Sequence, residues 1–402
     1  MALTADFLII GGGVIGLNLA LQIRRRHSAS KIILIEKESH CGKHASGRNS
    51  GVLHAGFYYT ADSLKARFTR EGNSCMTEYC RTRGLRINRC GKLVVAKDPA
   101  DLAGLEELLE RAQKNGVELH EITDKEARAI EPRIKTYGKA LYSPTTASVD
   151  PGEVMISLVD DAQKAGINIL TNTAYRRYKA PAVVTNKGRI AAGYVINAAG
   201  LYADKIAQDF GFSKDYRILP FKGIYLYSSE QPGALKTNIY PVPDLNHPFL
   251  GVHYTLTVDG KIKIGPTAIP AFWREHYQGL DNFNLRESIE ILGRELGMFL
   301  RNDFGFRSLA FNEIQKHFKS KLLMLATDLI TGVSEKHYQH WGSPGIRAQL
   351  VNIKERKLQM DFCYEGDHSS FHILNAVSPA FTCAMPFSEF LLEHIEQEKL
   401  AA

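Results

Sequence analysis

The sequence predicts an α/β protein of two parts, in which a domain of parallel strands and helices is interrupted by a mainly antiparallel β domain. Residues 7–10 form an apolar strand that leads through glycines into a helix and a second apolar strand. From Tyr216 to Thr267 the pattern changes to short strands, with Asp259-Gly260 as a hairpin turn. A strand (FHILNAV) and a helix after Ser378-Pro379 follow near the end, so we expect the first domain to be discontinuous.

The first turn carries the pattern G-x-G-x-x-G at Gly11, Gly13 and Gly16, and the next strand ends near Glu36. Gly11 permits a tight turn, Gly13 lets the backbone approach a pyrophosphate at the positive helix end, and Gly16 allows close packing. Glu36 can accept hydrogen bonds from ribose hydroxyls, and its charge would repel the 2′-phosphate of NADP. The combination predicts a Rossmann-like domain that binds a dinucleotide.

Later segments extend this domain and define the inserted one. Helices are predicted from Asp98-Pro99 and from Asp150, and Thr123 with Glu126 forms a capping-box pattern. Ala199 and Gly200 follow a strand as a second small-residue turn, which would let another backbone segment approach the dinucleotide. We assign residues 1–85, 145–215 and 340–402 to the nucleotide-binding domain and residues 86–144 and 216–339 to the substrate domain.

Composition excludes several other classes. The 402 residues are 44% hydrophobic and 23% charged, as in a globular protein, and no window is apolar enough to span a membrane. The net charge of +7 favours anionic partners, but the basic runs are short and lack a nucleic-acid-binding motif. Six cysteines without a C-x-x-C pair predict free thiols in a reducing compartment. His337 and His340 have no third ligand at useful spacing, so we expect no metal.

Longer motifs carry a more specific resemblance. GGGVIG with Glu36, GRNSGVLHAGFYY and INAAGLYAD resemble the glycine oxidase/D-amino-acid oxidase superfamily of FAD-dependent oxidoreductases. HAGFYYTADSLKARF, CGKLVVA, YPVPD, FLGVHYT, IGPTAIPAFWREHY, GIRAQ and NAVSPA, spread in order over the chain, resemble the L-2-hydroxyglutarate oxidase/dehydrogenase family.

The resemblance implies that the segment after the second strand lies beneath the flavin of FAD. The residues expected to bind FAD are Gly11, Gly13, Val14, Ile15, Gly16, Glu36, Lys37, Ser46, Asn49, Ser50, Gly51, Val52, Tyr175, Ala199, Gly200, Ser378 and Pro379. The HAG sequence at His54 also raises the hypothesis of a covalent flavin–histidine bond, as in some related dehydrogenases. Release of all flavin on acid denaturation, with unchanged protein mass, would exclude that bond.

The implied activity is oxidation of L-2-hydroxyglutarate, or a close 2-hydroxy acid, to the 2-oxo acid by hydride transfer to flavin N5. Such a reaction needs a base for the hydroxyl proton, and His54 and His253 are both candidates. It also needs a cation for the carboxylate, for which we favour Arg347, with Lys222, Tyr225 and Tyr240 as helpers.

Three points stay open at this stage. Lys222 and Ile224 stand where the family pattern has arginine and glutamate, so the exact substrate is not fixed. An amine or amino-acid oxidase, or a non-catalytic flavin-binding scaffold, are the alternatives. The electron acceptor is oxygen or a quinone-linked carrier, and the aromatic, basic segment AFWREHYQGL suits either a core or a peripheral membrane contact. The default location is cytoplasmic or peripheral to the inner membrane.

Overall fold

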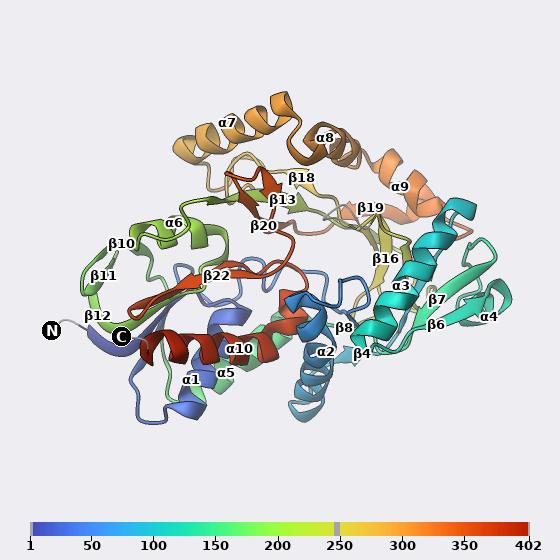
Figure 1. Cartoon of the computed structure of the whole chain (residues 1–402). Helices are drawn as coiled ribbons and strands as arrows, with labels where there is room; N and C mark the ends of the chain where they lie inside the picture. Colours follow the sequence, from blue (N-terminus) through green and yellow to red (C-terminus); the bar gives the residue numbers. More distant parts are fainter. Residues whose placement is uncertain (1–2, 245–249, 401–402) are drawn as a thin grey trace. The chain divides into compact units, whose positions relative to one another are not determined.

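The computed structural model describes residues 3–244 and 250–400 of the chain (Figure 1). Two compact units share these residues. The first contains Met1–Asn49, Pro151–Leu219 and Arg347–Ala402, and the second contains Ser50–Asp150 and Pro220–Ile346. Residues 245–249, inside the predicted β region from Tyr216 to Thr267 and including the first residue of FLGVHYT, lie outside the described ranges.

The unit boundaries differ from the sequence-based division in residues 50–85 and 145–150, which the structure groups with the second unit. Antiparallel pairing accounts for this difference, because β3 (Val52–Leu53) and β4 (Ile87–Asn88) both pair with β8 (Ala147–Val149). Residues 340–346 also belong to the second unit, since β19 (Tyr338–Trp341) pairs with β14 (Leu226–Ser228). Conversely, residues 216–219, assigned from the sequence to the substrate domain, belong to the first unit.

The first unit is built on a mainly parallel sheet with the strand order β10-β11-β12-β1-β2-β9. Its centre is β1 (Leu3–Ile10), which pairs in parallel with β2 (Ile32–Ile35) and β12 (Gly188–Asn197). These strands read as apolar runs because helices cover both faces of such a sheet. The outer strands are β9 (Asn168–Leu170), β10 (Tyr175–Lys179), β11 (Ala182–Thr185), β22 (Cys363–Gly366) and β23 (Ser370–Asn375).

Helix α1 (Val14–Arg26) follows β1 and contacts α5 (Pro151–Lys164) and α10 (Ala380–Leu400). Its carboxyl end is tied to α10 by an ion pair from Arg26 Nη1 to Glu396 Oε2 at 2.9 Å. β12 is followed by a 3₁₀ turn, η2 (Gly200–Tyr202), and by α6 (Ala203–Asp209). The small-residue turn expected at Ala199 and Gly200 is therefore present. The strand–turn–helix–strand unit expected at the start of the chain is therefore present.

The second unit contains an eight-stranded sheet in the order β19-β14-β17-β16-β15-β5-β7-β6. Its central strands are β5 (Lys92–Val95), β15 (Asn238–Pro241), β16 (His253–Leu256) and β17 (Ile262–Gly265), flanked by β7 (Lys139–Ser143) and β6 (His120–Thr123). β16 and β17 form the hairpin predicted around Asp259-Gly260. Because side chains alternate along a strand, one face packs an apolar core that includes Leu93, Tyr254 and Ile264.

The remaining elements surround this sheet or link the units. The helices are α2 (Leu64–Thr82), η1 (Pro99–Asp101), α3 (Leu102–Asn115), α4 (Asp124–Ile130), α7 (Leu285–Arg301), η3 (Asp303–Gly305), α8 (Phe306–Gln315), α9 (Lys319–Thr327) and η4 (Glu335–His337). A separate four-stranded sheet contains β13 (Tyr216–Gly223), β18 (Ile269–Pro270), β20 (Gly345–Asn352) and β21 (Lys357–Leu358). The caps predicted at Asp98 and at Thr123 with Glu126 are confirmed. Within the described ranges, no helix combines the length and the apolar character needed to cross a bilayer.

Candidate active site

The turn between β1 and α1, which we call the glycine turn (residues 11–16), leaves no room for side chains at two positions. Gly11 has a φ of +113°, and a Cβ there would lie 2.5 Å from the carbonyl oxygen of Ala198. A Cβ at Gly16 would lie 2.1 Å from the oxygen of Gly11. Both obstacles are backbone atoms, so the turn requires glycine at these positions.

The amino end of α1 is electrostatically suited to an anion. Gly13 is the N-cap and provides no capping side chain, and the first turn of the helix has no acidic residue to offset the helix dipole. The Val14 N–H donates to Ser46 Oγ at 2.9 Å, so the predicted serine lies at this helix end. Ile15 is buried within the same turn of α1.

Glu36 lies directly after β2 and is buried, with 8% of its surface exposed. Its Oε2 accepts the Gly12 N–H at 2.8 Å and its Oε1 accepts the Glu38 N–H at 2.9 Å. A carboxylate has about four acceptor positions, so two N–H donors leave capacity for hydroxyl groups. Sequence reasoning missed Thr173, whose N–H donates to the Glu36 carbonyl oxygen at 2.8 Å; no local motif marks it.

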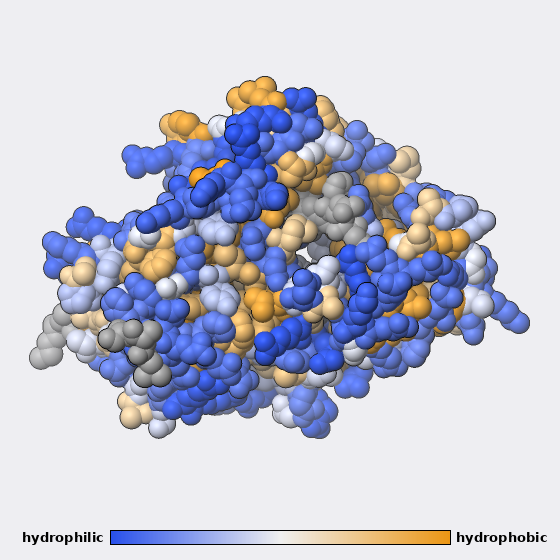
Figure 2. All heavy atoms as spheres, in the orientation of Figure 1, coloured by the Kyte–Doolittle hydropathy of each residue, from blue (hydrophilic) through white to orange (hydrophobic). Residues whose placement is uncertain are grey.

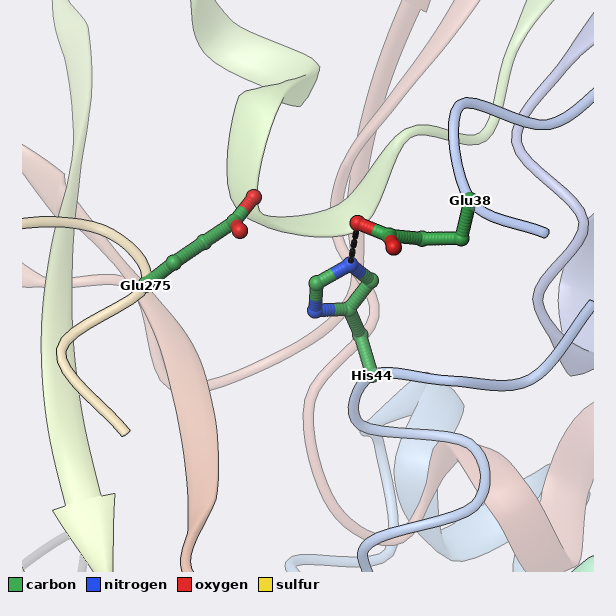
Figure 3. A group of neighbouring side chains, drawn as sticks. All are labelled: Glu38, His44 and Glu275. Atoms are coloured by element: carbon green, nitrogen blue, oxygen red, sulfur yellow. Dashed lines mark hydrogen bonds and ion pairs between the residues drawn. The ribbon is translucent and has the colours of Figure 1, made fainter. Parts of the chain in front are cut away.

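A second carboxylate, Glu38, organises the loop after Glu36. Its carboxylate accepts hydrogen bonds from Lys37 Nζ at 2.7 Å and from Lys43 Nζ at 2.6 Å. Its Oε1 also lies 3.1 Å from His44 Nε2 (Figure 3). Partial burial opposes ionisation, but the two ammonium groups lower the pKa of Glu38 to about 2. Lys37, which was expected to contact FAD, therefore forms an ion pair with Glu38. Glu275, the third side chain drawn, belongs to the second unit.

The small-residue turn after β12 lies against the end of β1. The Ala198 N–H donates to the Ile10 carbonyl oxygen at 2.9 Å, and the Ala199 N–H donates to Asn197 Oδ1 at 3.2 Å. Ala199 and Gly200 are therefore brought beside the glycine turn, as expected. Ser378 and Pro379 directly precede α10, and Asn49 Nδ2 donates to the Ser46 carbonyl oxygen at 2.8 Å.

Tyr175, also expected to contact FAD, begins β10. Its hydroxyl donates to Asp209 Oδ2 at 2.7 Å. Its ring packs against the apolar cluster that contains Ile10 and Ile35, as Ala199 does.

Ser50, Gly51 and Val52 belong to the second unit and lead into β3. The Ser50 carbonyl oxygen accepts a hydrogen bond from Lys263 Nζ at 3.0 Å. Gly51 has a φ of +76°, which favours glycine. This segment is therefore anchored to β17.

His253 lies on the face of the β-sheet opposite the apolar core and is 3% exposed. Its Nδ1 lies 2.7 Å from the Gly251 carbonyl oxygen, which can only accept, so Nδ1 carries the proton. Nε2 then keeps its lone pair, as a base requires. Burial, followed by the charges of Lys92 and Lys263, lowers the pKa of His253 to about 3, although the bond to Gly251 acts in the opposite direction.

His54 is also buried in the second unit. Burial first, and then the charges of Lys92 and His253, lower its pKa well below the usual value for histidine. The two histidines share Lys92 as a neighbour, so the structure brings both base candidates to one region. The geometry gives a definite proton position only for His253.

The predicted substrate-binding residues have different surroundings. Tyr240 stacks on His253, with ring centroids 3.8 Å apart, and Lys263 Nζ lies 4.6 Å from the centre of the Tyr225 ring. Lys222 is half-buried on β13, and burial lowers its pKa. Arg347 belongs to the first unit, where its Nε donates to Gln349 Oε1 at 3.1 Å.

Sequence reasoning missed Lys92 and Lys263, which are both buried and face the same side of the sheet as His253. Burial lowers the pKa of Lys92 to about 7 and that of Lys263 to about 8. We call the side of the sheet that carries Lys92, Tyr240, His253 and Lys263 the charged face. A lysine that alternates with apolar residues is normally read as solvent-facing, and CGKLVVA and KIKIG gave no contrary signal.

Comparison with known proteins gives a family. The family "FAD dependent oxidoreductase" (DAO) matches residues 6–370. The chain is 35% identical to the mitochondrial L-2-hydroxyglutarate dehydrogenase of Nematostella vectensis, over 96% of this chain and 90% of that protein. It is 34% identical to the L-2-hydroxyglutarate dehydrogenase of Escherichia coli K12, over 97% and 93%.

Solved structures agree on the fold. The dithionite-reduced L-alpha-glycerophosphate oxidase of Mycoplasma pneumoniae, with FAD bound, has a TM-score of 0.77 at 21% identity and covers 98% of this chain and 95% of that chain. The glycine oxidase of Bacillus cereus has a TM-score of 0.69 at 18% identity, with 98% and 95% covered.

The residues of the glycine turn fit the dinucleotide part of FAD. Gly11 and Gly16 bring backbone close together, the first turn of α1 has no acidic side chain, and the Glu36 carboxylate retains acceptor capacity. The chain therefore belongs to the DAO family of FAD-dependent oxidoreductases, within the group that contains the L-2-hydroxyglutarate dehydrogenases.

Proposed function

We propose that this protein oxidises L-2-hydroxyglutarate, or a close 2-hydroxy acid, to the corresponding 2-oxo acid. The observation that carries the proposal is the similarity, at 34–35% identity and over at least 96% of the chain, to proteins named L-2-hydroxyglutarate dehydrogenase. The basic group of Lys263, buried on the charged face, supports it, because it suits an anionic substrate.

The residues of the glycine turn would hold FAD, which would supply the oxidant for hydride removal from the substrate carbon. His253 Nε2 takes the hydroxyl proton, since the hydrogen bond from Nδ1 to Gly251 leaves that lone pair available. Lys263 and Tyr225 line the approach from the neighbouring strands, and Tyr240 orients the imidazole by stacking. His54 remains the second candidate for the base. Arg347 and Lys222 are proposed to hold substrate carboxylates.

The proposed FAD contacts follow from the two units separately. In the first unit the pyrophosphate lies on the amino end of α1 beside Ser46, and Glu36 binds ribose hydroxyls. The remaining proposed contacts are Gly11, Gly13, Val14, Ile15, Gly16, Lys37, Asn49, Tyr175, Ala199, Gly200, Ser378 and Pro379 in the first unit and Ser50, Gly51 and Val52 in the second.

Anaerobic flavin bleaching tests the substrate directly. The purified holoenzyme is mixed with L-2-hydroxyglutarate, D-2-hydroxyglutarate, L-lactate and glycine, and flavin absorbance is followed. We expect rapid bleaching with the L-diacid, with 2-oxoglutarate as product and no ammonia. Bleaching by glycine with ammonia release would establish the amine-oxidase alternative, and no bleaching with any compound would favour a scaffold.

We also propose that the electron acceptor is a quinone in a membrane. The outer face of α7 supports this proposal, because it suits contact with a bilayer. A row of apolar side chains recurs on one side of this helix, each 44–66% exposed: Leu285, Ile289, Leu292, Leu296 and Leu300. Orange spheres gather over α7 in Figure 2. The buried side includes Ile291 and Met298 beside Glu287, Ser288 and Glu295, so the helix carries apolar residues on its exposed side as well as on its buried side. Such a face suits the surface of a bilayer.

Flotation with vesicles that contain anionic phospholipid tests this surface. We expect binding at low salt, and at least a fivefold loss of bound protein in a Leu292→Ser/Leu296→Ser variant. Ile156→Ser, at a single exposed position on α5, is the matched control. If the double variant instead dissociates a dimer and floats unchanged, the surface joins two copies of the chain and the membrane proposal is wrong.

A further inference from the structure

Lys92 is the buried group for which the proposed reaction has no direct use. The side chain is fully buried, and no hydrogen-bond acceptor reaches its Nζ among the residues that the structure describes. An unpartnered ammonium in such a place is costly, so its presence in a well-packed sheet needs an explanation.

Three aromatic rings enclose the ammonium. Nζ lies 4.4 Å from the centre of the Tyr240 ring, 4.9 Å from that of Tyr58 and 5.2 Å from that of Phe57. These distances are within the range of cation–π attraction. The cage comes from two sources, since Phe57 and Tyr58 follow His54 in the chain, whereas Tyr240 comes from the neighbouring strand β15.

The cage formed by Phe57, Tyr58 and Tyr240 also contacts the proposed base, His253. The Tyr240 ring that contacts Lys92 also stacks on His253, with 3.8 Å between centroids and 17° between planes. On the other side, the cage residues Phe57 and Tyr58 are three and four positions after His54. Lys92 is therefore linked to both base candidates through rings that it contacts.

We infer that Lys92 is a positioning residue for the proposed oxidation, which holds Tyr240 against His253 and keeps the imidazoles uncharged and ready to accept a proton. It does not touch substrate in this role. The inference rests on the proposed function for its chemistry, but it concerns the charge of the histidines and can be measured without turnover.

Other charged or titratable groups also face this region and have to be weighed. They are His54 and Tyr58 before α2, Cys90 before β5, Tyr225 before β14, Tyr240 on β15, Lys263 on β17 and Lys316 after α8. Among the cations, Lys92 acts on both His54 and His253, whereas Lys263 and Lys316 act on His253.

The pH range of the effect follows from Lys92 itself. Burial lowers the pKa of Lys92 to about 7, so its charge is present below pH 7 and is lost as pH rises through that value. Below pH 7 the charge opposes protonation of the histidines. Above about pH 8 both Lys92 and the histidines are neutral, and Lys92 has no charge with which to act.

The test compares Lys92→Met, which keeps length without charge, with Lys92→Arg, which keeps the charge. In Lys92→Met we expect the acid limb of the kcat/KM profile to move up by about one pH unit. That shift corresponds to roughly tenfold lower activity on the limb, with the plateau well above the pKa of His253 nearly unchanged. Lys92→Arg should keep the original limb. Lys139→Met, in the same sheet but paired with Glu121, is the matched control.

A second measurement does not depend on the substrate. Nuclear magnetic resonance of ¹⁵N-labelled histidine, with His253 assigned by His253→Gln, should show a higher titration midpoint for His253 in Lys92→Met than in the wild type. Equal midpoints and an unshifted acid limb in a folded Lys92→Met protein would overturn the inference. If midpoints shift but no 2-hydroxy acid is oxidised, the role of Lys92 stands and the proposed function fails.

Discussion

The glycine turn contains almost no side chains, whereas the charged face is crowded with cationic and aromatic ones. In the turn, the need for glycine at positions 11 and 16 comes from backbone atoms, the oxygens of Ala198 and of Gly11. On the charged face, Lys92, Tyr240 and His253 come from three strands, and over 150 residues separate the first from the last. The glycine turn therefore depends on the absence of side chains, whereas the charged face depends on buried charge. Substitutions should reduce flavin binding in the turn and catalysis on the charged face.

The largest effect is expected at Gly16. Gly16→Ala would place a Cβ 2.1 Å from the Gly11 carbonyl oxygen, which is backbone and cannot move without distorting the turn. We expect the variant to purify with less than about a tenth of the normal flavin content, measured by absorbance. Gly293→Ala on α7, where no atom lies within 4 Å of the added Cβ, should keep its flavin. Full flavin content in Gly16→Ala would show that flavin binding does not require the close approach of Gly16 to the Gly11 carbonyl oxygen.

The next effect concerns catalysis on the charged face. His253→Gln should lower kcat/KM by about 10²- to 10⁴-fold, the usual contribution of a general base, without loss of flavin. His120→Gln, an exposed histidine on β6 of the same sheet, is the control. If His54→Gln shows the large loss and His253→Gln does not, the base is His54.

A smaller effect is expected for Glu36. Glu36→Gln leaves one of the two N–H donors, from Gly12 or Glu38, opposed to an amide NH₂ group. FAD affinity in flavin-release titrations should fall by about tenfold, corresponding to one lost charged hydrogen bond. Glu38→Gln, which leaves both contacts of Glu36 in place, should change affinity less. Equal losses in the two variants would remove the special role of Glu36.

The smallest effect is expected in the free energy of unfolding of a Lys92→Met variant. Its direction tests whether the buried charge serves stability or function. Because burial lowers the pKa of Lys92 from its ordinary value to about 7, the unfolded chain binds the proton more strongly than the folded one. This difference destabilises the fold below pH 7, and stability rises with pH between about 7 and 10. Lys92→Met should therefore raise the free energy of unfolding at pH 7, by roughly 2 kcal/mol or more, in urea titrations. A less stable variant would show that Lys92 mainly holds the fold together.

Much of the first unit could be predicted from local signals. The strand, glycine turn, helix and second strand were found, as was the small-residue turn at Ala199, and in the second unit the caps at Asp98 and Thr123. The hydrogen bond from the Tyr175 hydroxyl to Asp209 could not be predicted, because it depends on strand order, which residue patterns do not give. Helices α2 and α8 were also not predicted from the sequence.

The sequence by itself determined the glycine turn, the acid after the second strand and the two histidines as base candidates. These depend on backbone geometry and residue chemistry, which act over a few positions. Only the tertiary structure decided that Lys92 and Lys263 are buried, that Nδ1 of His253 is the protonated nitrogen, and that Tyr240 contacts both Lys92 and His253. The physical reason is that the pKa of a group and the partners of a ring are set by burial among distant strands, and local residue patterns do not encode that burial.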